Sequence, residues 1–345
     1  MIRPIFSVSK VITAVGAFGV ILLICALGSR TDSAARGLDF IKSGLPSNLD
    51  RHLLAKLELA EKLWSEAVED RKEMAQAMGN DRDFPDGYIR PYNTWDFARP
   101  SFFCPHDLER VGKLGDGGKV VCGMSLYEKE SPGPSSSTNE APELIMYSFG
   151  VNRDSSFEAE VLERTNAHIW GYDFSVDSWG EEITGQYSDR AHFHKIGIGK
   201  TTDKTQDPQF WSVQDLMAAN GHDYVDVVKM DIEGAEFDAL TSLIEHTIAM
   251  TPAGEKPSLP FGQLLIEIHF FTDRDSLNIP KKLDTWMNWW ASLEELGLRP
   301  VNNEDNWVGD NVFGKPRFME VRAYPFFLSL GYITRPHVIA RLTIF

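Results

Sequence analysis

The sequence has little cysteine, little basic charge and none of several common recognition motifs. Its 345 residues include 3 cysteines, too few for a disulfide-built scaffold and too scattered for a zinc module. Lys and Arg total 34 against 50 Asp and Glu, and this acidic balance argues against a nucleic-acid partner, because phosphate binding needs a basic face. The chain has no Asn-x-Ser/Thr sequon. It also has no G-x-G-x-x-G string, which disfavours a dinucleotide pyrophosphate site.

The composition is that of a folded protein, but its charge is uneven. Apolar residues make up 43% and charged residues 24%, which excludes wholesale disorder. At roughly 150 residues per domain, the length suggests about two domains. Residues 1–48 hold five basic and two acidic residues, although the whole chain carries −16. A basic, apolar start therefore precedes a strongly acidic body.

The first segment has the features of a membrane-targeting sequence. The uncharged run Val11–Gly28 would form a helix of roughly 27 Å, close to the thickness of a bilayer core. A signal peptide cleaved after Gly28 is the alternative, but the apolar core of a signal peptide usually spans only about 7–15 residues. We therefore predict a cytosolic tail (1–10), an uncleaved transmembrane signal anchor (11–28) and a luminal body. This makes a single-pass type II protein of the endoplasmic reticulum or Golgi. In an oxidising lumen Cys104 and Cys122 could bridge, and two buried free thiols are the alternative.

After the anchor we predict a linker and stem helix (29–90) and then one domain (91–345). Leu49–Met78 repeats apolar residues at three- and four-residue steps and ends before Gly79. The ordinary interpretation is a helix packed on the body, and a short self-associating coiled coil is the alternative. From residue 143 onward, short apolar runs alternate with amphipathic runs, a pattern typical of βαβ units and a parallel sheet.

The expected parallel strands are Leu144–Phe149, His168–Asp173, His192–Ile198, Val225–Asp231 and Gln263–Phe270. The expected helices are Ser156–Thr165, Val213–Asn220, Glu236–His246 and Pro280–Leu296. Two late strands, Arg299–Asn303 and Phe318–Tyr324, are predicted to pair as a hairpin. Ligands of such sheets bind outside the carboxyl ends of the strands, so the site is expected there.

Two of those ends carry features of a nucleoside site. Gly150 follows the first strand and permits a tight turn before a helix N-terminus. Asp173 ends the second strand about twenty residues later, where a carboxylate is placed to accept both hydroxyls of a ribose. Separately, each residue is compatible with an ordinary loop. Together they suggest a nucleoside ligand that lacks a pyrophosphate.

The fourth strand runs into the string Lys229–Glu236, KMDIEGAE, which holds three acids and a lysine. Such groups are costly at the end of an apolar strand unless they reach a binding site. An acidic helix start would account for Glu236 but less easily for Asp231. For a hydroxyl acceptor, the candidate general bases and catalytic residues are Asp231, Glu233 and His269. His269 follows Glu267 on the fifth strand, and both could point toward these acids.

KMDIEGAE resembles the hallmark string of FkbM-type S-adenosylmethionine-dependent methyltransferases. Arg110–Cys122, Tyr147–Glu158, Gly171–Asp173 and Leu265–His269 resemble segments of the related methyltransferase-like domain found behind single-pass anchors. The resemblance covers about residues 91–325. It implies an α/β, Rossmann-like class I methyltransferase fold, with a mostly parallel seven-stranded sheet and a C-terminal antiparallel hairpin. The chain departs from the family pattern at Tyr147-Ser148-Phe149-Gly150, where common members carry an acid in a glycine-rich loop.

The resemblance also implies the cofactor S-adenosyl-L-methionine and a set of residues that hold it. Gly150, Asn152 and Asp154 would line its methionine and ribose side, and Asp173 would accept from the ribose hydroxyls. Phe174 or Ile198 would flank the adenine, and Asp231 would lie near the centre of methyl transfer.

We predict no metal site, although acidic oxygens such as those of Asp231, Glu233 or Glu267 suit Mg²⁺ or Mn²⁺. His192 and His194 share one face of a strand without an evident third ligand, and we interpret them as structural. Gly115–Lys119, GDGGK, is either a loop that caps the site or an ordinary glycine turn.

Three functions compete at this level. The first is an anchored methyltransferase acting on a hydroxyl of a glycan or small molecule, with no nucleic-acid partner. The second is a type II glycosyltransferase whose metal-binding acid pair would be Asp231 with Glu233, or Asp273 with Asp275. The third is a catalytically silent binding protein on the same fold. The acceptor and the oligomeric state cannot be read from the residues.

Overall fold

The structure, a computed structural model, describes residues 51–79, 81–85, 94–115, 117–130, 144–270, 276–305 and 318–325. None of the helices in these ranges is both long enough and apolar enough to span a membrane. The predicted tail and anchor (residues 1–28), Asp273, Asp275 and the chain after residue 325 lie outside the described residues.

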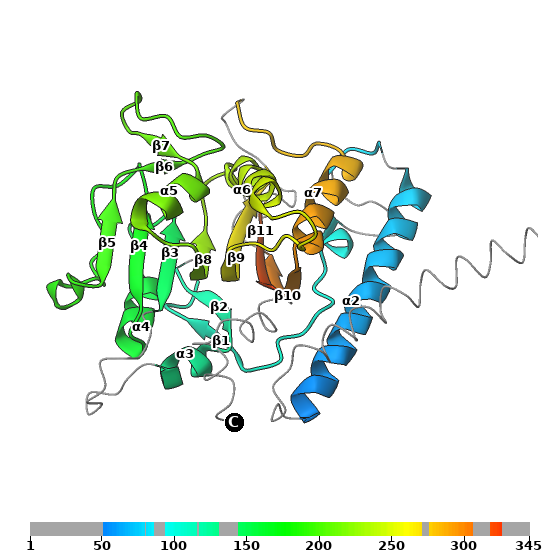
Figure 1. The fold of residues 1–345 in the computed structure, drawn as a ribbon, viewed down its shortest axis with the longest axis horizontal. Coiled ribbons are helices and arrows are strands. Elements are labelled where there is room, and N and C mark those ends of the chain that lie inside the picture. Colours follow the sequence, from blue (N-terminus) through cyan, green and yellow to red (C-terminus); the bar gives the residue numbers. More distant parts are fainter. Residues whose placement is uncertain are drawn as a thin grey trace, which may run out of the picture.

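A central sheet of seven strands organises the chain (Figure 1), in the order β10-β11-β9-β8-β3-β4-β5. The five parallel strands are β3 (Ile145–Phe149), β4 (His168–Tyr172), β5 (Ala191–His194), β8 (Val225–Met230) and β9 (Phe261–His269). The antiparallel pair is β10 (Leu298–Asp305) and β11 (Phe318–Pro325), and β11 pairs with β9. The predicted mostly parallel sheet with a C-terminal antiparallel hairpin is confirmed.

One predicted strand is wrong in its extent. His192–Ile198 was expected to be continuous, but β5 ends at His194 and the chain leaves the sheet. Gly197 and Ile198 form β6 (Gly197–Ile198), which pairs instead with β7 (Phe210–Trp211). A Cβ on Gly197 would lie 2.4 Å from the Phe210 ring, so this glycine permits the close approach that redirects the strand.

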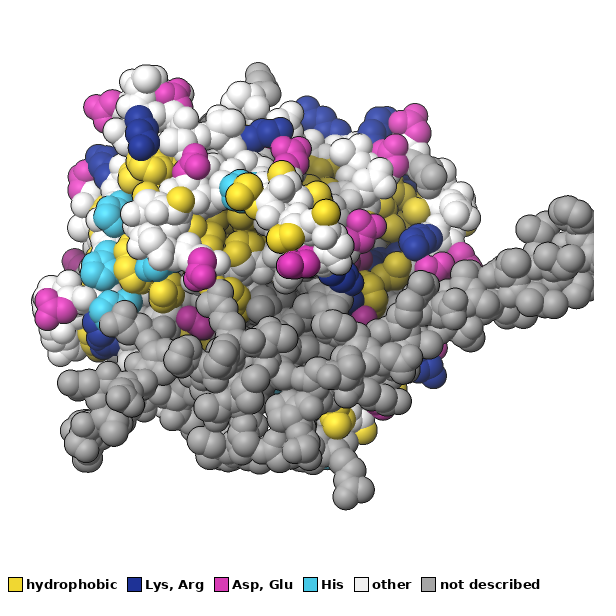
Figure 2. All heavy atoms as spheres, in the orientation of Figure 1, with side chains coloured by type: hydrophobic (Ala, Val, Ile, Leu, Met, Phe, Trp, Pro, Cys, Tyr) yellow, Lys and Arg dark blue, Asp and Glu magenta, His cyan; other side chains and the backbone are white. Residues whose placement is uncertain are grey.

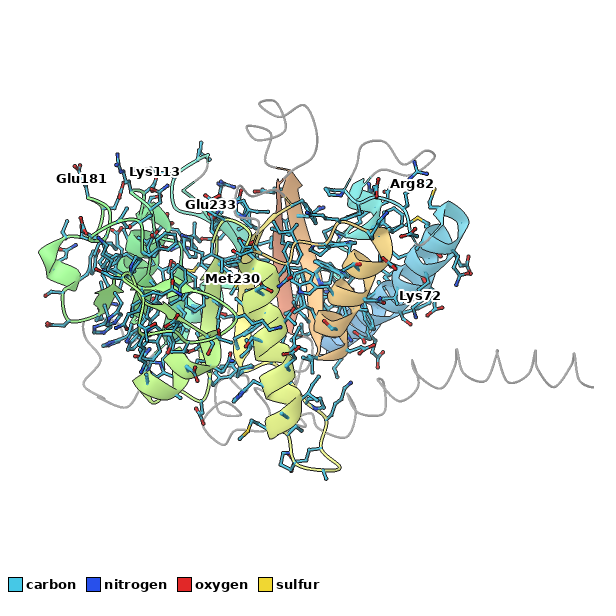
Figure 3. All side chains as sticks on the ribbon, turned by 90° about the horizontal axis from the view of Figure 1, so that it is seen from above. Lys72, Arg82, Lys113, Glu181, Met230 and Glu233 are labelled. Atoms are coloured by element: carbon cyan, nitrogen blue, oxygen red, sulfur yellow. A yellow bond between two sulfur atoms is a disulfide. The ribbon has the colours of Figure 1, made fainter. Side chains whose placement is uncertain are left out.

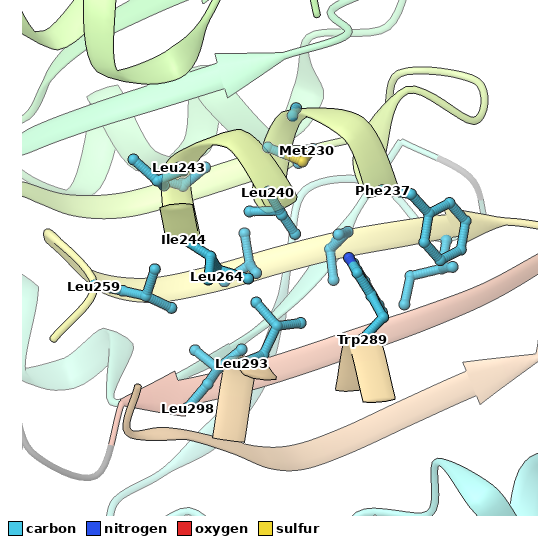
Figure 4. Close-up of a cluster of buried hydrophobic side chains, with 14 of the residues drawn as sticks. Met230, Phe237, Leu240, Leu243, Ile244, Leu259, Leu264, Trp289, Leu293 and Leu298 are labelled. Atoms are coloured by element: carbon cyan, nitrogen blue, oxygen red, sulfur yellow. The ribbon is translucent and has the colours of Figure 1, made fainter. Parts of the chain in front are cut away.

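Helices cover both faces of the sheet, as the alternating pattern predicted. One face carries α5 (Val213–Asn220), α6 (Glu236–Met250) and α7 (Leu283–Glu295), whose apolar side chains pack on β8 and β9. Figure 4 shows this cluster, including Phe237, Leu240, Leu264 and Trp289. The opposite face carries α3 (Met124–Glu130), α4 (Ser156–Arg164) and the hairpin of β1 (Leu108–Val111) with β2 (Lys119–Cys122).

A disulfide ties the β1–β2 hairpin to the segment before it. Cys104 and Cys122 are bridged, which decides between the bridge and the two free thiols that the sequence left open. The Gln263 side chain of β9 also holds Cys122. Its Oε1 accepts from the Cys122 N–H at 2.9 Å, and its Nε2 donates to the Cys122 carbonyl at 3.0 Å. Strand β2 is therefore fixed both to the sheet and to the preceding chain.

The predicted stem helix, α2 (Arg51–Met78), packs on the body near α7 (Figure 1). Arg71 donates to both carboxylate oxygens of Glu294 at 2.7 Å, and both side chains are almost fully buried. Arg299 pairs in the same two-pronged way with Glu61 and lies 3.4 Å above the ring of Trp64. These charge-assisted contacts agree with a helix packed on the body.

Candidate active site

The turn after β3 is built on Gly150, whose φ of +77° favours glycine. A Cβ on Gly150 would lie 1.7 Å from the carbonyl oxygen of Asp231, so the chain after β8 passes directly against this turn. The Gly150 N–H donates to the Tyr172 carbonyl at 3.0 Å, and the Asp231 N–H donates to the Phe149 carbonyl at 2.9 Å. The predicted cofactor turn and the predicted catalytic acid are thus neighbours through their backbones.

Asp173, directly after β4, closes this turn. Its Oδ2 accepts from the N–H groups of Val151 (2.9 Å) and Asn152 (2.8 Å), and its Oδ1 accepts from the N–H and hydroxyl of Ser175 (2.7 Å each). Burial alone would raise the pKa of Asp173, but these hydrogen bonds, led by that from Asn152, lower it. A carboxylate offers about four acceptor positions. A ribose hydroxyl would therefore have to replace one of the present donors, of which the Ser175 hydroxyl is the most easily rotated.

Asn152 and Asp154 lie between this turn and α4. Asn152 has a φ of +49° and an exposed side chain. Asp154 Oδ1 accepts from the Ser156 N–H at 2.9 Å, and Asp154 Oδ2 lies 3.7 Å from Lys113 Nζ. Burial would raise the pKa of Asp154, whereas the Ser156 hydrogen bonds and the Lys113 charge lower it. In this structure the Asp154 carboxylate is therefore hydrogen-bonded to the first residue of α4.

The two residues expected to flank an adenine lie at one corner of the sheet. Phe174 is 37% exposed, and its ring lies 5.4 Å from that of Phe210. Ile198 is buried in β6, next to Gly197, on which Phe210 packs. An apolar surface thus adjoins the end of β4, on the side predicted for the base.

The three predicted catalytic residues come together. Asp231 follows β8, Glu233 stands two residues later with a φ of +58°, and His269 ends β9. His269 Nε2 lies 3.8 Å from Asp231 Oδ1 and 3.6 Å from Glu233 Oε2. Their side chains are 27% (Asp231), 75% (Glu233) and 4% (His269) exposed. Figure 3 shows Glu233 beyond Met230, on the side of the molecule where Lys113 also lies.

His269 is held as a cation. Its Nδ1 is 2.9 Å from Glu236 Oε1, which also accepts from the Ile232 N–H. Burial alone would lower the pKa of His269, but the charge and hydrogen bond of Glu236, with Asp231 and Glu267, raise it to about 10. A protonated imidazole cannot accept a proton. The geometry therefore favours the carboxylates over His269 as the general base.

Lys119 of β2 is a member of this cluster that sequence reasoning treated only as part of a loop. The residue is 2% exposed, and its Nζ lies 3.8 Å from Asp231 Oδ2 and 3.5 Å from Glu267 Oε2. Glu267 Oε1 in turn lies 3.9 Å from His269 Nε2, as expected for two alternating residues on one strand. The available signal was a lysine directly before the apolar triplet Val120–Cys122.

A second buried ion pair supports the Gly150 turn. Lys229 of β8 donates to the Gly150 carbonyl at 2.5 Å and lies 3.3 Å from Glu158 Oε1. Ser148 donates its hydroxyl to the same Oε1 at 2.5 Å. Glu158 is fully buried in the first turn of α4. Sequence reasoning missed Glu158, because its neighbours in α4 predicted only an amphipathic helix.

Two groups bear on metal binding. One ligand atom from each of Asp231, Glu233 and His269 lies within 4.8 Å of the others, so the group could hold a divalent cation in place of the His269 proton. That no metal is required stays a prediction. Figure 2 shows histidines gathered at one edge of the visible face. Ring packing accounts for the pair on β5, since His192 lies tilted against Trp170 at 4.7 Å and His194 stacks on Tyr172 at 5.2 Å.

A family model described as a methyltransferase domain matches residues 58–311. No curated protein matches the chain. Similar solved structures include a Burkholderia thailandensis 1,6-didemethyltoxoflavin-N1-methyltransferase with S-adenosylhomocysteine (13% identity, TM-score 0.31, covering 53% of this chain and 71% of that one). Others are a Catenulisporales acidiphilia 16S rRNA (adenine(1408)-N(1))-methyltransferase mutant (13%, 0.30, 64% and 98%) and the antibiotic-resistance methyltransferase Kmr (14%, 0.30, 64% and 100%).

Proposed function

The chain belongs to this family of methyltransferase domains, and its cofactor is S-adenosylmethionine. We propose that it methylates a hydroxyl group of a glycan or small molecule in the secretory pathway. The family match, which spans most of the chain, is the observation that supports methyl transfer as the reaction. The choice of a hydroxyl is supported by the FkbM-like string Lys229–Glu236 and by the carboxylate of Asp231, which lies against the Gly150 turn.

The residues at the ends of β3 and β4 suit the cofactor. The Gly150 turn leads into the N-terminus of α4, and Asp173 supplies a carboxylate that is oriented by its own hydrogen bonds. Phe174 supplies a partly exposed ring beside them. When bound, S-adenosylmethionine supplies an activated methyl group on a sulfonium. The chain then has to align the acceptor and remove its proton.

Asp231 is the residue that suits proton removal. Its side chain is partly exposed and its Oδ1 faces His269 Nε2 at 3.8 Å, a contact that restricts the orientation of the carboxylate. Glu233 is further out and can contact the acceptor. His269 contributes positive charge beside the carboxylates, and we assign it no proton-accepting step. These roles extend the sequence prediction, which left the base open among the three residues.

The location rests on separate observations. The apolar run Val11–Gly28 supports a type II anchor, and the Cys104–Cys122 bridge is consistent with an oxidising lumen of the endoplasmic reticulum or Golgi. An Asn-x-Thr sequon introduced into the exposed α2 surface, for example Asp70→Asn with Lys72→Thr, should be glycosylated in cells. A cytosolic body would leave this site unmodified.

Titration calorimetry of the purified full-length chain tests the function. We expect S-adenosylmethionine and S-adenosylhomocysteine to bind, and UDP-sugars to give no heat. Labelled methyl transfer to methyl glycosides of glucose, galactose and mannose then tests the acceptor class, and Asp231→Asn should abolish it while adenosyl binding persists. Adenosyl binding without transfer to any hydroxyl probe would favour the silent binding protein. UDP-sugar binding alone would favour the glycosyltransferase.

The ribose assignment has its own test. Asp173→Ala should weaken S-adenosylhomocysteine at least tenfold if the carboxylate contacts the ligand or shapes its turn. Ser175→Ala removes only the competing hydroxyl, so binding should be unchanged or tighter. Weaker binding by Ser175→Ala would show that the hydroxyl helps the ligand and that Asp173 need not exchange its donors.

A further inference from the structure

The β1–β2 hairpin precedes the sheet in the chain, yet it places Lys119 in the cluster at the carboxyl ends of β8 and β9. We propose that Lys119 is a positioning residue for Asp231, and that the Cys104–Cys122 disulfide, by fixing strand β2, makes methyl transfer depend on the redox state of the protein. This inference rests on the proposed function and adds a regulated residue to its site.

Lys119 and His269 face different oxygens of Asp231. Lys119 Nζ lies 3.8 Å from Asp231 Oδ2, whereas Oδ1 faces His269 Nε2. The ammonium also lies 3.5 Å from Glu267 Oε2, so it stands between two carboxylates that would otherwise repel each other. With the lysine side chain only 3% exposed, water cannot replace this charge. Lys119 and His269 therefore attract the Asp231 carboxylate from two directions and restrict its rotation.

The position of Lys119 depends on the strand that carries it. Strand β2 is four residues long and pairs only with β1 in its two-stranded sheet. Its other end, Cys122, is bonded to Cys104 and bridged by the Gln263 side chain. Removing the disulfide leaves the buried side chains of β2 and the Gln263 hydrogen bonds to hold the strand in place. The hairpin then loses its covalent tie at Cys122, on the same four-residue strand that carries Lys119.

A dithiol reagent supplies the electrons and protons that reduction of the disulfide requires. Dithiothreitol transfers two electrons and two protons to the Cys104–Cys122 bond, giving two thiols and the cyclic oxidised reagent. Cys25, the third cysteine, lies in the predicted anchor, and a Cys25→Ser variant shows whether any effect of reduction comes from it.

A labelling experiment tests the link without requiring turnover. Full-length protein is treated with an amine-reactive acetylating reagent, before and after reduction, and each lysine is followed by mass spectrometry. Lys119 should be protected when oxidised and at least fivefold more reactive when reduced. Lys113 on the same hairpin is 57% exposed and should react in both states. A Lys119 that stays protected in folded, reduced protein would overturn the redox link.

Turnover then tests the positioning role. Labelled methyl transfer from S-adenosylmethionine to the methyl glycosides should show kcat lowered about 10- to 100-fold by Lys119→Met, because a misplaced reacting group costs on this scale, with the cofactor KM within about twofold. Lys119→Arg should restore part of kcat, and Lys62→Met on α2 should change nothing. An unchanged kcat in folded Lys119→Met would refute the positioning role.

The combination separates the possible causes. Reduction should lower the kcat of the wild type but have little further effect on Lys119→Met, because the residue through which the disulfide acts is already gone. An equal loss in both would show that the disulfide acts on the fold in general and would overturn the link. Wild-type protein that neither binds S-adenosylmethionine nor transfers methyl groups would instead contradict the proposed function. The labelling result would still test whether the disulfide controls the exposure of Lys119, because it requires no turnover.

Discussion

Removing the Lys229 ammonium should destabilise the protein strongly, because its partner has no route to solvent. Lys229 is 5% exposed and Glu158 is fully buried. Lys229→Met would leave the Glu158 carboxylate with the Ser148 hydroxyl but without its cation, and would also remove the hydrogen bond to the Gly150 carbonyl. Breaking a buried pair from one side costs about 3–5 kcal/mol. We expect a loss of that size, together with weaker S-adenosylhomocysteine binding, since the Gly150 turn loses its support.

A double-mutant cycle makes this quantitative. Glu158→Gln keeps an acceptor for Ser148 but removes the charge, so the Lys229→Met/Glu158→Gln variant should be more stable than the sum of the single losses predicts. The coupling energy should be about 1–3 kcal/mol, as for contacting residues. Chemical denaturation of the full-length chain, followed by tryptophan fluorescence, measures it. Lys195→Met, which removes an exposed pair with Asp177, is the control and should leave the midpoint unchanged. Additive losses would refute the pairing.

Three further predictions concern the same framework. Gly150→Ala should lower stability by about 1–3 kcal/mol or more, since a left-handed φ is combined with a clash against the Asp231 carbonyl, and urea midpoints measure this loss. A Cys104→Ser/Cys122→Ser variant should lose about 3 kcal/mol in the chain-entropy model for a separation of 18 residues, and equal midpoints for the variant and the oxidised wild type would contradict it. The pKa of His269 rises on folding from 6.5 to about 10, so its stabilisation is complete below pH 6.5 and is lost as the pH rises through 10. Between pH 7 and pH 10 the wild type should therefore lose more unfolding free energy than His269→Gln, and parallel curves would show that the imidazole does not gain a proton on folding.

The fold could be predicted from the sequence because its signals are local. Each buried strand is a short apolar run, each crossover helix has a three-to-four-residue period, and the carboxyl ends of parallel strands meet at one edge. That rule alone brings Asp231 and His269 together, although they lie on different strands. The break after His194 was missed because it depends on the Phe210 ring, which comes to Gly197 from a later segment.

The charged partners of the site could not be predicted in the same way. Lys119 lies 112 positions before Asp231 in the chain, on a hairpin whose packing no periodicity reveals. Glu236 looked like a favourable acid at a helix start, and only the packing of α6 against β9 shows that it holds His269. The protonation of His269 depends on carboxylates from three segments of the chain. Sequence reasoning thus located the edge of the sheet but not the balance of charge there.

The departure from the family pattern at Ser148 is interpreted differently once the position of Glu158 in the structure is known. The resemblance to common methyltransferases leads one to expect an acid in the loop after the first strand, and its absence motivated the silent binding protein. Here the hydroxyl of Ser148 donates to a carboxylate that arrives from α4, and Lys229 joins that carboxylate to the Gly150 carbonyl. The Glu158 carboxylate is fully buried and paired with Lys229, so it supports the Gly150 turn from behind and does not face a ligand. Because this network holds the Gly150 turn in place without an acid in the loop, the altered loop does not by itself argue against activity.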